Sequence, residues 1–181
     1  IRDRSQYGNK TRNSLFRLTD FFTLFYYKFI EPNNTKDERW WSNNIDSRSV
    51  SAWMGLSFEL VCLSHHRQIK TALGIAGVGT SVSTWRSKAD PESGTPGFQI
   101  DLIIERADRI IHLCEMKFST DLYGITDSYE MKLRERMGLF RLATKNKKAL
   151  VNTFVTTYGV VNGKHKSIVH SEVKMDDLFN S

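Results

Sequence analysis

Residues 98–118, FQIDLIIERADRIIHLCEMKF, decide how the chain folds. Two runs of this stretch, 98–105 and 110–118, are rich in Ile, Leu and aromatic residues, which favour strands. The polar residues 106–109 between the two runs are typical of a turn. We therefore expect an antiparallel hairpin at the centre of the fold.

Charged residues interrupt both strands of this predicted hairpin. Side chains alternate between the faces of a strand, so Glu115 and Lys117 share one face. Closing the hairpin at 107–108 places Asp101 nearly opposite Glu115, within one residue of register. Two such carboxylates repel each other unless one is protonated or a cation lies between them. Oxygen ligands suit Mg²⁺ or Mn²⁺, and a nearby lysine can stabilise charge on a phosphate. These three side chains together predict a site for metal-assisted hydrolysis of phosphodiesters. The alternative is that they form a structural cluster of ion pairs.

The segments around the hairpin alternate between helical and strand patterns. We expect a helix over 50–71, a strand over 78–85, a helix over 129–144, and strands over 149–158 and 167–173. This order predicts an α/β fold, a three-layer sandwich with a mixed central sheet.

The N-terminal region differs in composition from the rest of the chain. Residues 1–12 are polar and predict a tail, and the aromatic segment 21–30 predicts a helix capped by Asp20. That helix is apolar nearly all round, so we expect it to be buried in the core or to dock a missing domain. Residues 31–49 predict a linker with an aromatic anchor at Trp40 and Trp41. We divide the chain into a helical linker segment, 1–49, and a domain over 50–181.

Composition excludes several classes of protein. The 181 residues are 40% hydrophobic and 25% charged, which is typical of one globular domain. No apolar run approaches the roughly 20 residues that cross a bilayer. Cys62 and Cys114 lie in apolar surroundings, which indicates buried thiols in a reducing compartment, the cytoplasm. No CxxC or HExxH pattern supports a zinc site.

Positive charge concentrates in one segment. The chain has a net charge of +6, and the segment 131–148 alone holds an excess of that size. Its cationic residues are Lys132, Arg134, Arg136, Arg141, Lys145, Lys147 and Lys148, against the single acidic residue Glu135. Such a helix is either a solvated face or a contact to a nucleic-acid backbone.

Gly97-Phe98-Gln99-Ile100-Asp101 followed by Cys114-Glu115-Met116-Lys117 resembles the core motif of the PD-(D/E)xK, restriction-endonuclease-like nuclease superfamily. Gly55-Leu56-Ser57-Phe58-Glu59 is similar to the acidic motif of that superfamily's first helix, and the element order is similar to its αβββαβ core. Phe98-Gln99 replaces the Pro of the motif, a loosely specified position. Residues 14–30 resemble the segment before the C-terminal nuclease-like domain of prokaryotic AAA-type ATPases.

The resemblance implies roles for individual residues. Asp101 and Glu115 would bind Mg²⁺ or Mn²⁺, with the Met116 carbonyl as a third ligand. Lys117 would be the catalytic lysine and Glu59 an accessory acid. From the residues alone, Glu59 is more simply a carboxylate at the edge of an apolar helix stripe, paired with a basic side chain.

Three functions follow as hypotheses. The first is a metal-dependent nuclease that acts on DNA as the C-terminal domain of a larger ATPase. The second is a non-catalytic module of that ATPase that binds DNA or a partner through a dormant nuclease fold. The third is a structural or regulatory domain docked through 21–30, with a homodimer as one form. None of them involves a membrane.

Overall fold

The computed structural model describes residues 7–8, 18–33, 37–89, 91–92, 94 and 96–180. The predicted tail at 1–12 lies outside these residues except for Tyr7 and Gly8, as do 14–17 of the segment that resembles the ATPases. The helices are α1 (Phe21–Phe25), η1 (Tyr26–Ile30), α2 (Trp40–Asn44), α3 (Arg48–Ser64), α4 (His66–Ala72), α5 (Asp127–Thr144), η2 (Lys166–Ile168) and η3 (Met175–Leu178). The strands are β1 (Thr80–Ser87), β2 (Phe98–Arg106), β3 (Ile110–Lys117), β4 (Ala149–Thr156) and β5 (Ser171–Lys174).

One mixed, open sheet organises the molecule, and its strands follow in the order β1-β2-β3-β4-β5. The β1–β2 and β2–β3 pairs are antiparallel, whereas β3–β4 and β4–β5 are parallel. The hairpin predicted over 98–118 is therefore confirmed, and so is the α/β fold with a mixed sheet. Arg109 has a positive φ of 72°, which lets a turn of three residues reverse the chain.

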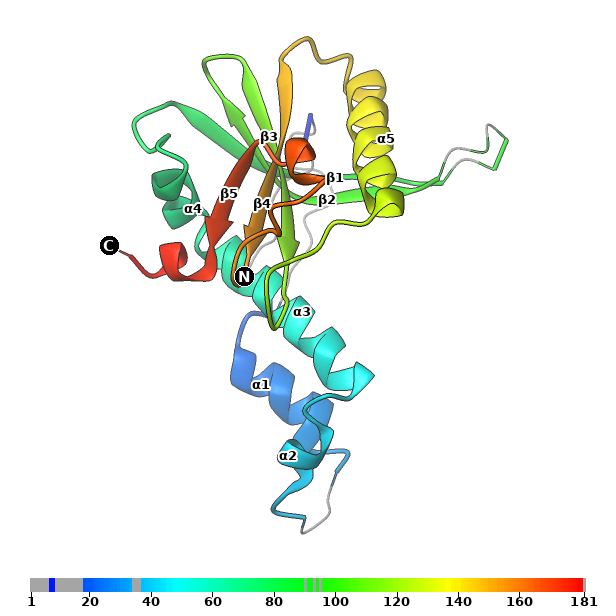
Figure 1. Ribbon diagram of the computed structural model, residues 1–181, viewed down its shortest axis with the longest axis vertical. Helices are drawn as coiled ribbons and strands as arrows, with labels where there is room; N and C mark the ends of the chain where they lie inside the picture. Colours follow the sequence, from blue (N-terminus) through cyan, green and yellow to red (C-terminus); the bar gives the residue numbers. More distant parts are fainter. Residues whose placement is uncertain are drawn as a thin grey trace.

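Helices cover the two faces of this sheet (Figure 1). On one face α3 and α4 pack over Leu102, Ile104 and Cys114. On the other face Phe140 of α5 packs over Ile103 and Leu113. The three layers bury the apolar side of each element, which is the main stabilising contribution to such a fold. No helix in the described part of the chain is both long enough and apolar enough to cross a membrane.

The N-terminal helices form an arm that extends from the sheet along the first half of α3 (Figure 1). Asp20 caps α1 as predicted, because its side chain accepts a hydrogen bond from Thr23 N. The expected burial of 21–30 is wrong for most of the segment. Phe29 is buried, but Phe22 is 68% exposed and Tyr27 is 59% exposed. The arm is too thin to enclose a helix that is apolar on every side.

The predicted linker at 31–49 contains regular structure. It holds α2 and the first residues of α3, which begins at Arg48. The reason is aromatic packing: Trp41 lies 5.3 Å from Phe25 and 6.4 Å from Trp53, measured between ring centroids. Such contacts bury large apolar surfaces. The expected boundary between residues 49 and 50 falls within α3.

Other helix and strand boundaries also differ from the predicted ones. The helix predicted over 50–71 is broken at His65, whose ring Nδ1 lies 2.8 Å from the Val61 carbonyl. The strand predicted over 167–173 is a 3₁₀ turn, η2, followed by the short β5. Both cysteines are buried and free, and burial raises the pKa of each thiol.

Candidate active site

Glu115 and Lys117 meet on β3, the central strand of the sheet. Lys117 Nζ lies 2.8 Å from Glu115 Oε1. The Glu115 side chain is 9% exposed and that of Lys117 is 31% exposed. The predicted pairing of these side chains on one strand face is therefore present, with the carboxylate inside and the ammonium toward solvent.

Two side chains of α5 also hold Glu115. Tyr129 Oη donates a hydrogen bond to Oε1, and Arg136 Nη2 donates one to Oε2. The ammonium of Lys117 also lies 5.1 Å from the centre of the Tyr129 ring, close enough for a cation–π contact. Neither α5 residue was predicted from the sequence to contact Glu115. The signal exists, because Tyr129, Leu133, Arg136 and Phe140 follow helical spacing on one face of α5.

The electrostatics favour an ionised Glu115. Burial raises the pKa of its carboxyl, but Arg136 and Lys117 outweigh that effect, and the pKa lies below its ordinary value. Tyr129 responds in the opposite direction, since burial and the neighbouring Glu115 charge raise the pKa of its hydroxyl. One carboxylate with two cations leaves this cluster with a net positive charge.

The strands β2 and β3 separate beside this cluster. Their ladder ends at the pair Leu102↔Cys114, although both strands continue. The ladder does not extend to Asp101 and Glu115, so the predicted strand pairing of these two residues is not formed. Beyond that point β2 stays paired with β1, and β3 stays paired with β4. We call the region where the two strands are no longer paired with each other, 98–101 and 115–117, the fork. The backbone of Met116 lies in it.

A β-bulge redirects β2 at Asp101. Ser83 pairs with Ile103 and Trp85 pairs with Ile100, so Thr84 alone faces Asp101 and Leu102. As a result Ile100 and Ile103 both belong to the core on the α5 face. Bulges often re-aim side chains next to active sites.

Asp101 takes its hydrogen bond from its own strand. Gln99 Nε2 donates to Asp101 Oδ1, and Gln99 Oε1 accepts from Arg86 Nε over 3.0 Å. Glu115, by contrast, contacts Lys117 of β3 and Tyr129 and Arg136 of α5. Because Ile100 packs on the α5 face, alternation along β2 puts Gln99 and Asp101 on the α3 face. Glu115 lies on the α5 face, so the structure does not bring the two carboxylates together as the sequence predicted.

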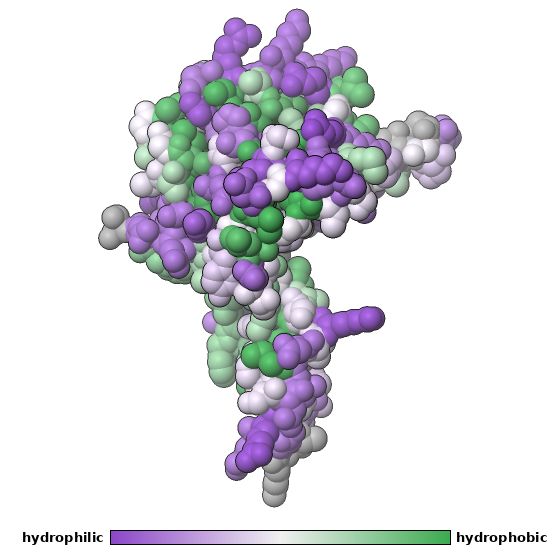
Figure 2. All heavy atoms as spheres, in the orientation of Figure 1, coloured by the Kyte–Doolittle hydropathy of each residue, from purple (hydrophilic) through white to green (hydrophobic). Residues whose placement is uncertain are grey.

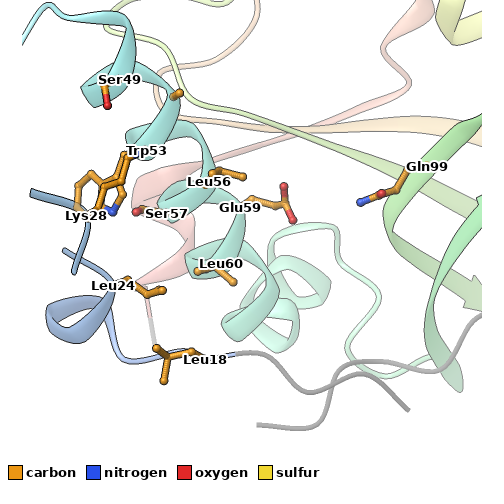
Figure 3. Close-up of a pocket in the computed structure, with 11 residues that line it drawn as sticks. Leu18, Leu24, Lys28, Ser49, Trp53, Leu56, Ser57, Glu59, Leu60 and Gln99 are labelled. Carbon is orange, nitrogen blue, oxygen red and sulfur yellow. The ribbon is translucent and has the colours of Figure 1, made fainter. Parts of the chain in front are cut away.

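Glu59 lies in a groove between the arm and the sheet. The groove has a volume of about 680 Å³, and its walls are mainly apolar. In Figure 3, Glu59 of α3 and Gln99 of β2 point toward each other across it. Gln99 contacts Asp101, so one end of the groove adjoins the fork. Asp101, Glu115 and Lys117 are not among the described residues that line the groove.

The donor set suits a hard cation in its chemistry. Asp101, Glu115 and the Met116 carbonyl offer oxygen ligands only. Within the described ranges, no three His, Cys, Asp or Glu side chains are grouped so that they could hold a metal ion. Glu59 therefore does not complete a three-carboxylate site with the other two acids. A cation at Glu115 would also have to share an oxygen that already accepts from Lys117, Tyr129 or Arg136.

The predicted cationic surface is smaller than its sequence suggests. Arg136 is 11% exposed and faces the sheet, so the expected contact with a nucleic-acid backbone is not available to it here. Arg134 pairs with Glu130, Lys148 pairs with Glu105, and Arg141 donates to the Lys148 carbonyl. Of the seven cationic residues of the segment 131–148, three have no partner among the described residues, namely Lys132, Lys145 and Lys147. Hydrophilic side chains project from the end of the molecule where α5 leads into β4 (Figure 2).

Comparisons with known proteins leave the family open. No family model matches the chain, and no curated protein matches it. A solved structure described as a crystal structure of a protein of unknown function, AF1548, is similar over 65% of this chain with a TM-score of 0.43 and 14% sequence identity. The match spans 64% of the length of that protein.

Proposed function

We propose that the chain hydrolyses DNA phosphodiester bonds with the help of Mg²⁺ or Mn²⁺. The observation that carries the proposal is the Glu115–Lys117 contact on β3, beside the point where the ladder between β2 and β3 ends. A carboxylate and an ammonium at a point where a sheet opens suit a reaction that builds negative charge on a phosphate. The resemblance of these residues to the PD-(D/E)xK motif supports the same reaction.

Each residue has one role in this proposal. Asp101 and Glu115 would hold the cation with the Met116 carbonyl, and the cation would activate a water and neutralise the phosphate. Lys117 would orient that water or stabilise the phosphate oxygens. Glu59 would act from the groove through Gln99, which contacts Asp101. The larger ATPase around this domain also belongs to the proposal, and its support is the resemblance of 14–30 to the segment before the nuclease-like domain of such ATPases.

Lys117→Met tests the reaction. Pure protein is incubated with plasmid DNA and Mg²⁺ or Mn²⁺, and the fraction of cut DNA is measured over time. We expect Lys117→Met to lower the rate by roughly 100-fold or more, since a positioned acid–base or charge-stabilising group contributes about that much. Lys164→Met is the matched control, because Lys164 is an exposed lysine that pairs with Asp127 at the surface and has no role in either proposed function. Absence of cutting by the wild type, or equal cutting by Lys117→Met, counts against the nuclease.

A second function, DNA binding without cutting, is favoured by a specific observation. Both oxygens of Glu115 already accept donors from side chains of the protein. Lys132, Lys145 and Lys147 would then contact phosphates. Lys132 and Lys145 are separated by thirteen residues of α5 and its cap, about 20 Å at 1.5 Å per residue.

Salt dependence distinguishes this second function from the first. A binding module would hold DNA without Mg²⁺, and its affinity would fall steeply with salt. Replacing all three lysines with Met should reduce the slope of log affinity against log salt by roughly 2.7, at about 0.9 per phosphate contact. Fluorescence anisotropy with a labelled duplex measures that slope. An unchanged slope excludes these lysines as the binding surface.

A further inference from the structure

Arg136 is a buried cation on an otherwise apolar helix face. It follows Leu133 and precedes Phe140 on the stripe of α5 that packs on the sheet, and both neighbours are fully buried. Its Nη2 donates to Glu115 Oε2, while its Nε is buried without a hydrogen-bond partner. A buried cation needs a compensating anion, and Glu115 is the acid that pairs with it in the described part of the chain.

Lys117 and Arg136 differ in how easily they can leave Glu115. The Lys117 side chain is partly exposed and sits at the end of β3, so its ammonium can move into water. The Arg136 side chain is only 11% exposed and contacts Glu115 from α5, so its guanidinium has less access to water than the Lys117 ammonium. Arg136 is therefore the fixed positive charge beside Glu115.

A divalent cation on Glu115 would lie next to that fixed charge. Repulsion between a guanidinium and a doubly charged ion that share one carboxylate is strong where little water penetrates. The hydrogen bond from Arg136 also takes one of the two oxygens that the cation would use. Both effects weaken metal binding at Glu115.

We infer that Arg136 is an internal counter-ion that competes with the divalent cation for Glu115 and sets the metal affinity of the site. This inference rests on the proposed function, because it concerns the same cation. It gives Arg136 the opposite role from the phosphate contact expected from the sequence. The protein without metal keeps its central carboxylate neutralised by its own side chain.

Mn²⁺ binding to the whole chain tests the inference without a measurement of cutting. Isothermal titration calorimetry is carried out on the wild type, Arg136→Met, Arg136→Gln and Arg136→Lys. Circular dichroism checks that each variant is folded, and the two neutral variants provide independent chances of a folded protein. Arg134→Met is the matched control, since Arg134 lies on the same helix but pairs with Glu130 at the surface.

Removal of the charge should tighten Mn²⁺ binding by roughly tenfold or more in Arg136→Met and Arg136→Gln. Arg136→Lys and Arg134→Met should stay within about threefold of the wild type. Equal or weaker binding in the neutral variants, with clear binding by the wild type, overturns the inference and leaves the nuclease proposal intact. Absence of Mn²⁺ binding in every variant overturns the inference together with the metal site of the proposed function.

Discussion

Each face of β3 buries an ionisable group, and the group is ionised on one face and neutral on the other. On the face toward α5, Glu115 is kept ionised by Arg136 and Lys117. On the face toward α3, His112 is 2% exposed and is kept neutral. Burial, followed by the positive charge of Arg106, lowers the pKa of His112 to about 4.

The difference lies in the chemistry of the two groups, because both are buried and one is an acid whereas the other is a base. Each group has a nearby arginine, since Arg106 Nη1 lies 3.5 Å from His112 Nε2 and Arg136 contacts Glu115. An arginine stabilises a carboxylate but opposes a proton on imidazole. The ring is held as a neutral partner of Thr153, whose Oγ1 lies 2.8 Å from His112 Nδ1. One strand thus carries a charged site on one face and a neutral polar contact within the core on the other.

Glu115→Gln should have the largest effect on stability. The substitution leaves Arg136 buried without an anion, and breaking a buried ion pair in this way costs about 3–5 kcal/mol. We expect the free energy of unfolding, measured by urea denaturation, to fall by that amount. Activity of Glu115→Gln is therefore a poor test of catalysis unless its folding is checked.

Asp101→Asn is the control for that substitution. Asp101 is only partly buried and accepts a hydrogen bond from Gln99, which can also donate to an amide oxygen. We expect a change of no more than about 0.5 kcal/mol. If the two variants lose equal stability, the contrast between a buried site at Glu115 and an open position at Asp101 is wrong.

The neutral state of His112 should make stability depend on pH. Its pKa is about 4 in the folded protein and about 6.5 in an unfolded chain. Below pH 6.5 the unfolded chain takes up a proton that the folded protein does not, so stability falls as the pH drops from about 6.5 to about 4. The full loss is about 3 kcal/mol. Acidification below about pH 4.5 then begins to protonate Glu115 in the unfolded chain, which lowers stability further.

Urea denaturation at pH values from 7 to 4.5 isolates the contribution of His112, because that of Glu115 begins below about pH 4.5. His112→Gln should flatten the profile above pH 5. His170→Gln should reduce the slope only slightly, because the charge of His170 is a smaller cause of the lowered His112 pKa than burial and Arg106. A His112→Gln profile as steep as that of the wild type would assign the slope to another group.

Tyr129→Phe, on the α5 face of β3, should lower the free energy of unfolding by a moderate amount. The substitution removes the hydroxyl that donates to Glu115 Oε1 and keeps the ring against Tyr123. Hydrogen bonds to charged groups contribute about 1.5–3 kcal/mol, and Lys117 and Arg136 remain on the carboxylate. We therefore expect a loss near the lower end, about 1.5 kcal/mol, in urea denaturation. A loss as large as that of Glu115→Gln would mean that the hydroxyl, and not the arginine, stabilises the buried charge.

The sequence predicted the parts of this contrast that depend on local pattern. Alternation within 110–118 placed Glu115 and Lys117 on one face and His112 on the other, as the structure has them. The hairpin register followed from the turn at 106–109. Local pattern determines these features because neighbouring side chains of a strand have a fixed geometry.

Contacts between elements were not predictable in the same way. Arg136 reaches Glu115 across 21 residues, and that contact depends on how α5 is rotated on the sheet. The bulge at Asp101 has no marker in Ile-Asp-Leu-Ile-Ile, so the redirection of β2 was missed. The burial predicted for 21–30 was wrong for a further reason. An apolar segment indicates burial, but the fraction that is covered depends on how the arm packs.

Arg134→Met should have the smallest effect on the free energy of unfolding. Arg134 is 60% exposed and pairs with Glu130 one turn earlier on α5, and such pairs are screened by water and salt. We expect urea denaturation to show no change beyond measurement error. Arg136→Met, two residues along the same helix, should instead change both stability and Mn²⁺ affinity. Equal effects of the two substitutions would show that net positive charge on α5 acts on the site from a distance, and that burial of Arg136 against the sheet is irrelevant to it.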